Sequence, residues 1–139
     1  MHANTALAAG TVLADIGASR RQAEPSRYTI QRGQADHLDL RPADLRFINH
    51  GCSPNVHFDV ERMVLVALRD LDVGDELRCF YPATEWSMAE AFDCACGAPD
   101  CLGRIGGAVA MPAAQLRRYC LSPFVAAQLQ ARGTLESAG

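Results

Sequence analysis

Three of the six cysteines in this 139-residue chain lie within one short segment, and this cluster constrains the fold more than any other feature. The segment runs from Cys94 through Cys96 to Cys101. Gly97 and Pro99 lie inside it and can bend the backbone around a central point. Three thiolates do not complete a tetrahedral structural zinc site, so a fourth ligand has to come from another part of the chain. The spacing favours a metal site over three buried thiols that cluster by chance.

The fourth ligand is to be sought among Cys52, Cys79 and Cys120. Cys52 is the best candidate because it lies in a loop bounded by glycine and proline, whereas Cys79 lies within an expected strand and Cys120 at the end of an expected helix. A metal ion held by Cys52 and the clustered cysteines would join the last third of the chain to a loop that is distant in sequence. We therefore expect the metal to have a folding role.

The sequence up to residue 81 has the pattern of a small β protein. Residues 56–60 alternate between apolar and polar side chains, and a turn at Glu61 and Arg62 leads into the apolar run 63–68. This pattern predicts a β-hairpin whose second strand is buried. Together with other short apolar segments, strands are expected over residues 11–13, 28–30, 56–60, 63–68 and 76–81.

The pattern changes to short helices after residue 81. Thr84 can cap a helix that runs to Glu90 and leads into the cysteine cluster. Pro112 and Pro123 each stand where the first position of a helix is expected, and Gly133 is a stop signal for the second of these helices. The fold class is therefore mainly β with short helices, and the last two helices should pack on the β core.

Composition and charge exclude some classes of protein. The formal net charge of −3 argues against a binder of duplex DNA and suits a basic protein partner. The longest apolar run is far shorter than the roughly 20 residues that cross a bilayer, and no secretion signal is recognisable, so we expect a soluble, cytoplasmic protein. All thirteen basic residues are arginine and alanine and glycine are abundant, which suggests a GC-rich bacterial genome. The oligomeric state is left open.

Three separate motifs resemble those of one known family. Residues 46–55, Arg-Phe-Ile-Asn-His-Gly-Cys-Ser-Pro-Asn, resemble the Asn-His-Ser-Cys-x-Pro-Asn signature of SET-domain lysine methyltransferases. Residues 74–81, Gly-Asp-Glu-Leu-Arg-Cys-Phe-Tyr, resemble the second signature of that family, and residues 94–103 resemble its zinc-binding post-SET element. The motifs occur in the family's order, and similarity to its earlier strands extends the resemblance over most of the chain.

This resemblance implies a SET-type β-clip fold of small sheets, in which the first signature passes beneath the loop made by the second in a knot-like crossing. The SET domain would cover residues 1–90, the post-SET zinc segment 91–104, and C-terminal helices packed on the same domain 105–139. The family has a Gly-x-Gly cofactor turn on its first strand, and no such turn precedes the first recognisable turn of this chain. Gly51 and Phe80 depart from the serine and aspartate of the family's signatures.

The resemblance also implies the roles of individual residues. Zinc would be held by Cys52, Cys94, Cys96 and Cys101, the set that includes the fourth ligand favoured above. S-adenosylmethionine would contact Asn49 and His50, with Arg46 and Phe47 nearby. Tyr81 would be the catalytic tyrosine next to the methyl transfer, and Tyr28 would line the lysine channel. Cys79 stands where the family has a phenylalanine or tyrosine that limits the number of methyl groups added, so its small side chain predicts di- or trimethylated products.

The expected function is S-adenosylmethionine-dependent methylation of a protein or peptide lysine. Methyl transfer is an in-line displacement, so it requires a neutral and aligned amine, and an apolar channel helps because it disfavours the ammonium form. Two alternatives are a non-catalytic SET-like module that binds a peptide in the same groove, and an enzyme adapted to a small-molecule substrate such as an amine. No direct contact with nucleic acid or a membrane is expected.

Overall fold

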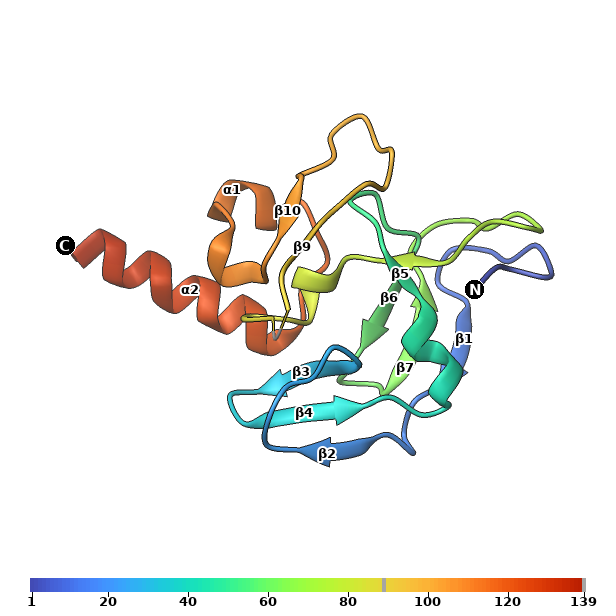
Figure 1. Ribbon diagram of the computed structural model, residues 1–139, viewed down its shortest axis with the longest axis horizontal. Coiled ribbons are helices and arrows are strands. Elements are labelled where there is room, and N and C mark those ends of the chain that lie inside the picture. Colours follow the sequence, from blue (N-terminus) through green and yellow to red (C-terminus); the bar gives the residue numbers. More distant parts are fainter. Residues whose placement is uncertain (89, 139) are drawn as a thin grey trace.

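The computed structural model of the protein describes residues 1–88 and 90–138, and most of its regular elements are short β-strands (Figure 1). Two three-stranded antiparallel sheets form the larger part. One sheet has the order β1-β7-β6, from strands Val12–Asp15, Val64–Ala67 and Val56–Asp59. The other has the order β2-β4-β3, from strands Arg20–Gln22, Asp36–Asp39 and Thr29–Gly33. The predicted fold class, mainly β with small sheets, is confirmed.

The predicted hairpin is the pair β6 and β7. Phe58 faces Leu65 across the pair, and both side chains are buried. The turn between the strands ends at Met63, whose φ of 55° lies in the left-handed region. The pairing was predicted correctly, but the expectation that the second strand is buried holds only in part: residues of β7 alternate between half-buried and buried, whereas the first three residues of β6 are all buried.

Two further pairs of short strands build the region around the cysteines. Strand β5, Asn49–His50, runs parallel to β8, Arg78–Cys79. Strand β9, Phe92–Asp93, pairs antiparallel with β10, Arg104–Ile105. The strand expected over 76–81 is shorter than predicted, because a 3-10 turn at Tyr81–Ala83 begins directly after Phe80. This turn directs the backbone away from the sheet at Tyr81.

The two C-terminal helices are α1, Ala113–Leu116, and α2, Pro123–Ala138. Pro123 is the first residue of α2, as predicted, whereas Pro112 lies one residue before α1. The stop expected at Gly133 is wrong, since α2 continues to Ala138. A glycine inside a helix costs only about 1 kcal/mol relative to alanine, which is too little to end a helix by itself.

The helix predicted over 84–90 is also wrong. The described residues of this segment, 84–88 and 90, form a turn and bends. Their backbone bonds to distant segments instead: the Gln31 amide donates to the Thr84 carbonyl at 2.9 Å, and the Ala108 amide donates to the Glu85 carbonyl at 2.8 Å. Tertiary hydrogen bonds satisfy the carbonyls that a helix would have used, so they outweigh the local helix signal.

The described residues form two apolar cores. The larger core lies between the two three-stranded sheets and the segment after β4, and it includes Ile16, Leu38 and Leu65. The smaller core includes Phe80 and Ala83 and is covered by Leu116, Val125 and Leu129 of the C-terminal helices. These helices therefore pack on the segment after β8, and α2 also contacts β3 of the second sheet. Within the described part of the chain, every helix is too short or too polar to cross a bilayer.

Candidate functional site

The parallel pairing of β5 with β8 brings the two signature segments side by side. His50 is opposite Cys79, and Asn49 is opposite Arg78. The Gly51 amide extends the ladder by donating to the Cys79 carbonyl at 3.0 Å. A Cβ atom at Gly51 would lie 3.0 Å from two side-chain carbons of Arg78, so a side chain here would require Arg78 to move. Glycine at this position therefore fits the close approach of the Arg78 side chain.

Asn55 fastens the end of the first signature to the second. Its side-chain amide donates to the Glu76 carbonyl at 2.9 Å, and its side-chain oxygen accepts from the Arg78 amide at 2.8 Å. The Asn55 backbone amide also donates to the Arg78 carbonyl at 3.0 Å. Asn55 is buried, so these bonds satisfy side-chain and backbone groups of Asn55 that would otherwise bond to water.

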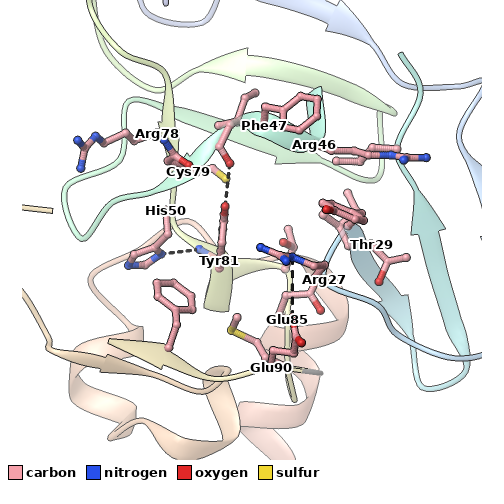
Figure 2. Close-up of a pocket in the computed structure, with 18 of the residues that line it drawn as sticks. Arg27, Thr29, Arg46, Phe47, His50, Arg78, Cys79, Tyr81, Glu85 and Glu90 are labelled. Atoms are coloured by element: carbon pink, nitrogen blue, oxygen red, sulfur yellow. Dashed lines mark hydrogen bonds and ion pairs between the residues drawn. The ribbon is translucent and has the colours of Figure 1, made fainter. Parts of the chain in front are cut away.

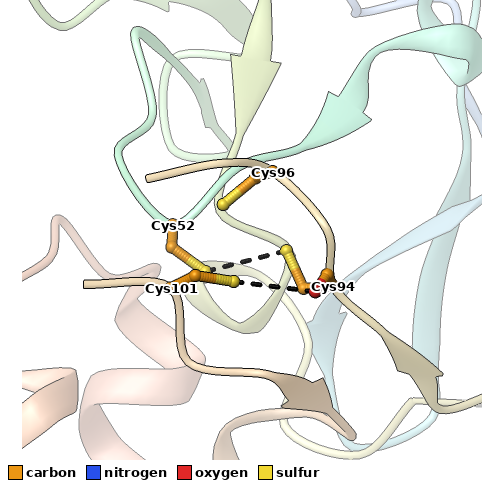
Figure 3. Close-up of side chains that lie close together, drawn as sticks. All are labelled: Cys52, Cys94, Cys96 and Cys101. Carbon is orange, nitrogen blue, oxygen red and sulfur yellow. Dashed lines mark hydrogen bonds between the residues drawn. The ribbon is translucent and has the colours of Figure 1, made fainter. Parts of the chain in front are cut away.

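The four predicted zinc ligands lie together (Figure 3). Ligand atoms of Cys52, Cys94, Cys96 and Cys101 all lie within 4.8 Å of one another. Sulfurs bound to one tetrahedral zinc at about 2.3 Å are about 3.8 Å apart, and the Cys52 and Cys94 sulfurs are 3.8 Å apart. All six cysteines of the chain are free thiols. Four free thiols at this spacing fit one zinc ion, and the choice of Cys52 over Cys79 and Cys120 agrees with the geometry.

The environment of the cluster contains donors suited to thiolates. The Leu102 amide donates to the Cys52 sulfur at 3.4 Å. Hydrogen bonds from the backbone of Cys52 and of Ala98 lower the pKa of Cys96 to about 6. Burial raises the pKa of Cys52 to about 12, so this thiol depends on a bound cation to become a thiolate.

His50 links the cysteine cluster to Tyr81. Its Nδ1 accepts a hydrogen bond from the Tyr81 backbone amide at 3.1 Å, and its Nε2 lies 3.4 Å from the Cys52 sulfur. Burial, assisted by the charge of Arg78, lowers the pKa of His50 to about 4, so the ring is neutral at physiological pH. Because Nδ1 accepts, the single ring proton is assigned to Nε2, from which it points at the sulfur. The His50 ring therefore contacts both the loop that contains Cys52 and the first residue of the Tyr81–Ala83 turn.

Tyr119 fastens the C-terminal region to the same loop. Its hydroxyl donates to the Cys52 carbonyl at 2.8 Å, and its ring stacks on Phe80 with centroids 3.6 Å apart. Phe80 is the residue that stands in place of the family's aspartate. The stacking gives this departure a packing role in the smaller core.

A cavity of about 780 Å³ opens beside these elements (Figure 2). Its volume lies within the range of small-molecule sites. Its lining includes all seven residues to which the sequence assigned cofactor or catalytic roles: Tyr28, Arg46, Phe47, Asn49, His50, Cys79 and Tyr81. Cys94 and Cys96 also line it, so the cysteine cluster and the cavity share a wall.

Tyr81 and Cys79 lie on the wall formed by the second signature. The Tyr81 hydroxyl donates to the Ile48 carbonyl at 2.8 Å, which leaves its oxygen lone pairs available to a ligand. Burial raises the pKa of Tyr81 to about 12 and that of Cys79 to about 12, so both groups are neutral at physiological pH. Tyr81 can therefore orient a ligand but does not act as an anionic base.

Another part of the cavity lining combines aromatic rings with guanidinium groups. Phe47 is 65% exposed and Tyr28 is 39% exposed. The Arg46 guanidinium lies 5.6 Å from the centre of the Tyr28 ring and pairs with Asp39 at 2.7 Å. Among the described residues, the buried Nε of Arg46 has no hydrogen-bond partner. An unpaired guanidinium N–H beside this cavity suits an anionic ligand group.

Asn49, one of the predicted cofactor contacts, uses its side chain in a hydrogen bond to another segment of the chain. Its side chain is exposed and donates to the Glu76 carboxylate at 2.8 Å. Its backbone, in β5, remains on the cavity wall. In this structure the Asn49 side chain therefore stabilises the segment that leads into β8.

The sequence reasoning missed the residues that the 84–90 segment contributes. Thr84, Glu85, Met88 and Glu90 all line the cavity. The sequence predicted a helix over this segment and assigned no site role to Glu85, whereas its side chain is buried and lines the cavity. The only local signal in the sequence was the position of the Glu85 carboxylate next to the aromatic Trp86. This signal is too weak to identify a residue that lines a pocket.

Comparison with known proteins agrees with this architecture. The family model described as "SET domain" matches residues 3–82. The chain therefore belongs to the SET-domain family, and its cysteine cluster is a feature that the motifs led us to expect.

Its relatives are named as methyltransferases. Methyltransferase flvH of Aspergillus flavus is 40% identical over 122 residues, which cover 86% of this chain and 68% of that protein. The histone-lysine N-methyltransferase ash1 of Drosophila melanogaster is 38% identical over 47% of this chain, and an H3 lysine-36 specific enzyme of Schizosaccharomyces pombe is 36% identical over 56% of it. The chain spans only 3% and 10% of these two relatives. Family and relatives together support an S-adenosylmethionine-dependent methyltransferase.

Proposed function

We propose that this protein transfers methyl groups from S-adenosylmethionine to the side-chain amine of a lysine in a protein or peptide. The observation that carries the proposal is the position of Tyr81, whose hydroxyl lies in the wall of a cavity that also contains the predicted cofactor residues. The relatives whose names specify histone lysines support this substrate class.

The donor would occupy the side of the cavity formed by the first signature. Arg46 offers an unpaired guanidinium N–H to the carboxylate of the donor's methionine part, while His50, Phe47 and the Asn49 backbone line the adjoining wall. Bound S-adenosylmethionine supplies an electrophilic methyl group on a sulfonium sulfur. The cation–π stack of Arg46 on Tyr28 holds the guanidinium near the cavity edge.

Tyr81 and Tyr28 would position the acceptor. The Tyr81 hydroxyl is oriented by its bond to Ile48, and its oxygen accepts a hydrogen bond from the amine N–H. This bond directs the amine lone pair along the line of displacement. Such alignment of the reacting groups supplies most of the rate enhancement of this kind of reaction. The Tyr28 ring lines the access to the cavity, and the small Cys79 leaves room for methyl groups already attached to the nitrogen.

Zinc would be held by Cys52, Cys94, Cys96 and Cys101 in a structural role. A four-thiolate site has no open position for a substrate. Its effect on the active site is indirect: it holds Cys94 and Cys96 against the cavity and, through Cys52, positions His50 and the Tyr81 turn.

A small primary amine is a second candidate acceptor. Methyltransferase flvH, whose name specifies no protein substrate, resembles most of the chain. The three arginines in the cavity lining, Arg27, Arg46 and Arg78, do not favour a strongly basic peptide. Radiolabelled methyl transfer tests both candidates with one enzyme preparation. Lysine-containing histone peptides labelled faster than free lysine and n-butylamine support the main proposal, the reverse order supports the second, and no labelling of any of them contradicts both.

A further inference from the structure

Among the described residues that line the cavity, Glu85 is the one whose carboxyl group is buried. Its residue is 7% exposed, it follows the Tyr81–Ala83 turn directly after Thr84, and it lines the same cavity as Tyr81 and Cys79. Among the described residues, the Oε1 atom of Glu85 is buried without a hydrogen-bond partner. An ionised carboxylate in such a place is costly unless a cation or a donor joins it.

Within the part of the chain that the structure describes, no cationic group forms a hydrogen bond with the Oε1 atom of Glu85. From the neighbouring elements, Cys79 and Tyr81 present neutral groups, and Gln31 of β3 offers a backbone hydrogen bond. Arg27 pairs with Glu90 at 3.8 Å at the exposed edge of the cavity, where both side chains are 68% exposed. Arg132 of α2 lies 5.6 Å from the centre of the Trp86 ring. The unpaired oxygen is therefore available to a ligand that enters the cavity.

We propose that Glu85 is the residue that receives the substrate amine and takes up its proton. This inference rests on the proposed function, since it concerns the acceptor of the same reaction. In the step, one N–H bond of the substrate ammonium breaks and an O–H bond forms on Glu85, so that the ammonium and the carboxylate become a neutral amine and a neutral carboxylic acid. The nitrogen lone pair released by this step is the pair that forms the new N–C bond.

The environment favours the neutral pair. Burial raises the pKa of Glu85 well above its usual range, and the same burial disfavours a substrate ammonium. A buried pair of ammonium and carboxylate would carry the desolvation cost of two charges. The neutral pair of amine and carboxylic acid keeps one hydrogen bond without that cost. The substrate class is thus a primary or partly methylated amine that enters as a cation and reacts as a neutral base.

The test compares Glu85→Gln with the wild-type enzyme at pH values from 7 to 10. Glutamine keeps the shape of the side chain but cannot take a proton, so the variant must capture amine that is already neutral in solution. At pH 7.5 only about one molecule in a thousand of an amine with a pKa near 10.4 is neutral. We expect Glu85→Gln to lose about 100- to 1000-fold in kcat/KM at pH 7.5 and to recover about tenfold per pH unit as the pH rises.

The pH range avoids the titration of two groups of the second signature that lie in the cavity wall, Cys79 and Tyr81. The pKa values of Cys79 and Tyr81 are about 12 and so lie above this range, and the chain contains no lysine. Glu90→Gln serves as the matched control, because it removes a carboxylate from the exposed edge of the same cavity. A pH-dependent loss of similar size in Glu90→Gln would overturn the proposal, since it would show a general effect of the local charge.

A binding measurement separates this inference from the proposed function. We expect calorimetry at pH 7.5 to show that n-butylamine binds Glu85→Gln at least tenfold more weakly than wild type, while S-adenosylhomocysteine binds both equally. Equal affinity for n-butylamine, or a kcat/KM of Glu85→Gln that parallels wild type at every pH, overturns the role of Glu85. Absence of methyl transfer by the wild-type protein contradicts the proposed function, and the calorimetric result then decides the role of Glu85 alone.

Discussion

The Tyr81→Phe substitution removes a single oxygen atom from the cavity wall and tests the role of the tyrosine in methyl transfer. The lost hydroxyl donates to the Ile48 carbonyl at 2.8 Å, and Ile48 is 2% exposed. A hydrogen bond of this kind contributes about 1 kcal/mol, and a buried carbonyl left without a partner raises the cost to about 2 kcal/mol. In a chain of this size the melting temperature should fall by roughly 4 to 8 °C.

The effect on the reaction should be much larger than the effect on stability. Loss of a positioned hydrogen-bonding group next to the reacting atoms lowers kcat by about 100- to 1000-fold. Single-turnover methyl transfer to a lysine peptide measures this loss, and calorimetric titration with S-adenosylhomocysteine measures whether the cofactor site persists. We expect the affinity for S-adenosylhomocysteine to change by less than threefold.

Tyr119→Phe is the matched control for this substitution. The Tyr119 hydroxyl also donates to a backbone carbonyl at 2.8 Å, that of Cys52, but it lies outside the cavity lining. A similar decrease in melting temperature with a kcat within threefold of wild type is expected for Tyr119→Phe. If Tyr81→Phe retains kcat within threefold, or if both variants lose activity equally, the assignment of Tyr81 to the chemistry is refuted.

Two further substitutions test the neighbouring positions. Cys79→Tyr places a ring in the space beside Tyr81 and should shift the products from di- and trimethylated towards monomethylated lysine in mass spectra; the same product distribution in both proteins would contradict the role of Cys79. Cys52→Ala removes a zinc ligand and leaves the Leu102 amide without its acceptor, so it should cost at least about 3 kcal/mol in the free energy of unfolding and make stability insensitive to chelators. Cys120→Ala, at an exposed cysteine outside the cluster, should change that free energy by less than about 0.5 kcal/mol, and an equal loss in both variants in urea titrations would count against a structural metal.

Local sequence patterns were sufficient for the parts of the fold that depend on neighbouring residues. The β6–β7 hairpin followed from alternation and a turn, and the choice of Cys52 as fourth ligand followed from its loop position together with the spacing of the other three cysteines. The hairpin depends on neighbouring residues, whereas the distant Cys52 could be chosen because a tetrahedral zinc site requires a fourth ligand and few cysteines remain in the sequence.

The errors lie where distant segments determine the local structure. The helix expected at Thr84 does not form because Gln31 and Ala108 bond to carbonyls of that segment. The same contacts bury Glu85, so one unforeseen tertiary interaction explains both the wrong helix and the missed cavity residue. Gly133 was given more weight as a helix stop than its small energetic cost justifies.

The central claim is that a zinc ion joins the Cys52 loop to the post-SET segment and thereby holds the methyl-transfer site together. Elemental analysis of the purified protein, combined with titration of S-adenosylhomocysteine before and after chelation, tests it most directly. We predict one zinc ion per chain, loss of S-adenosylhomocysteine binding when the zinc is removed, and recovery when zinc is added back. A folded protein that contains no metal, or that binds S-adenosylhomocysteine equally well after chelation, would contradict the claim.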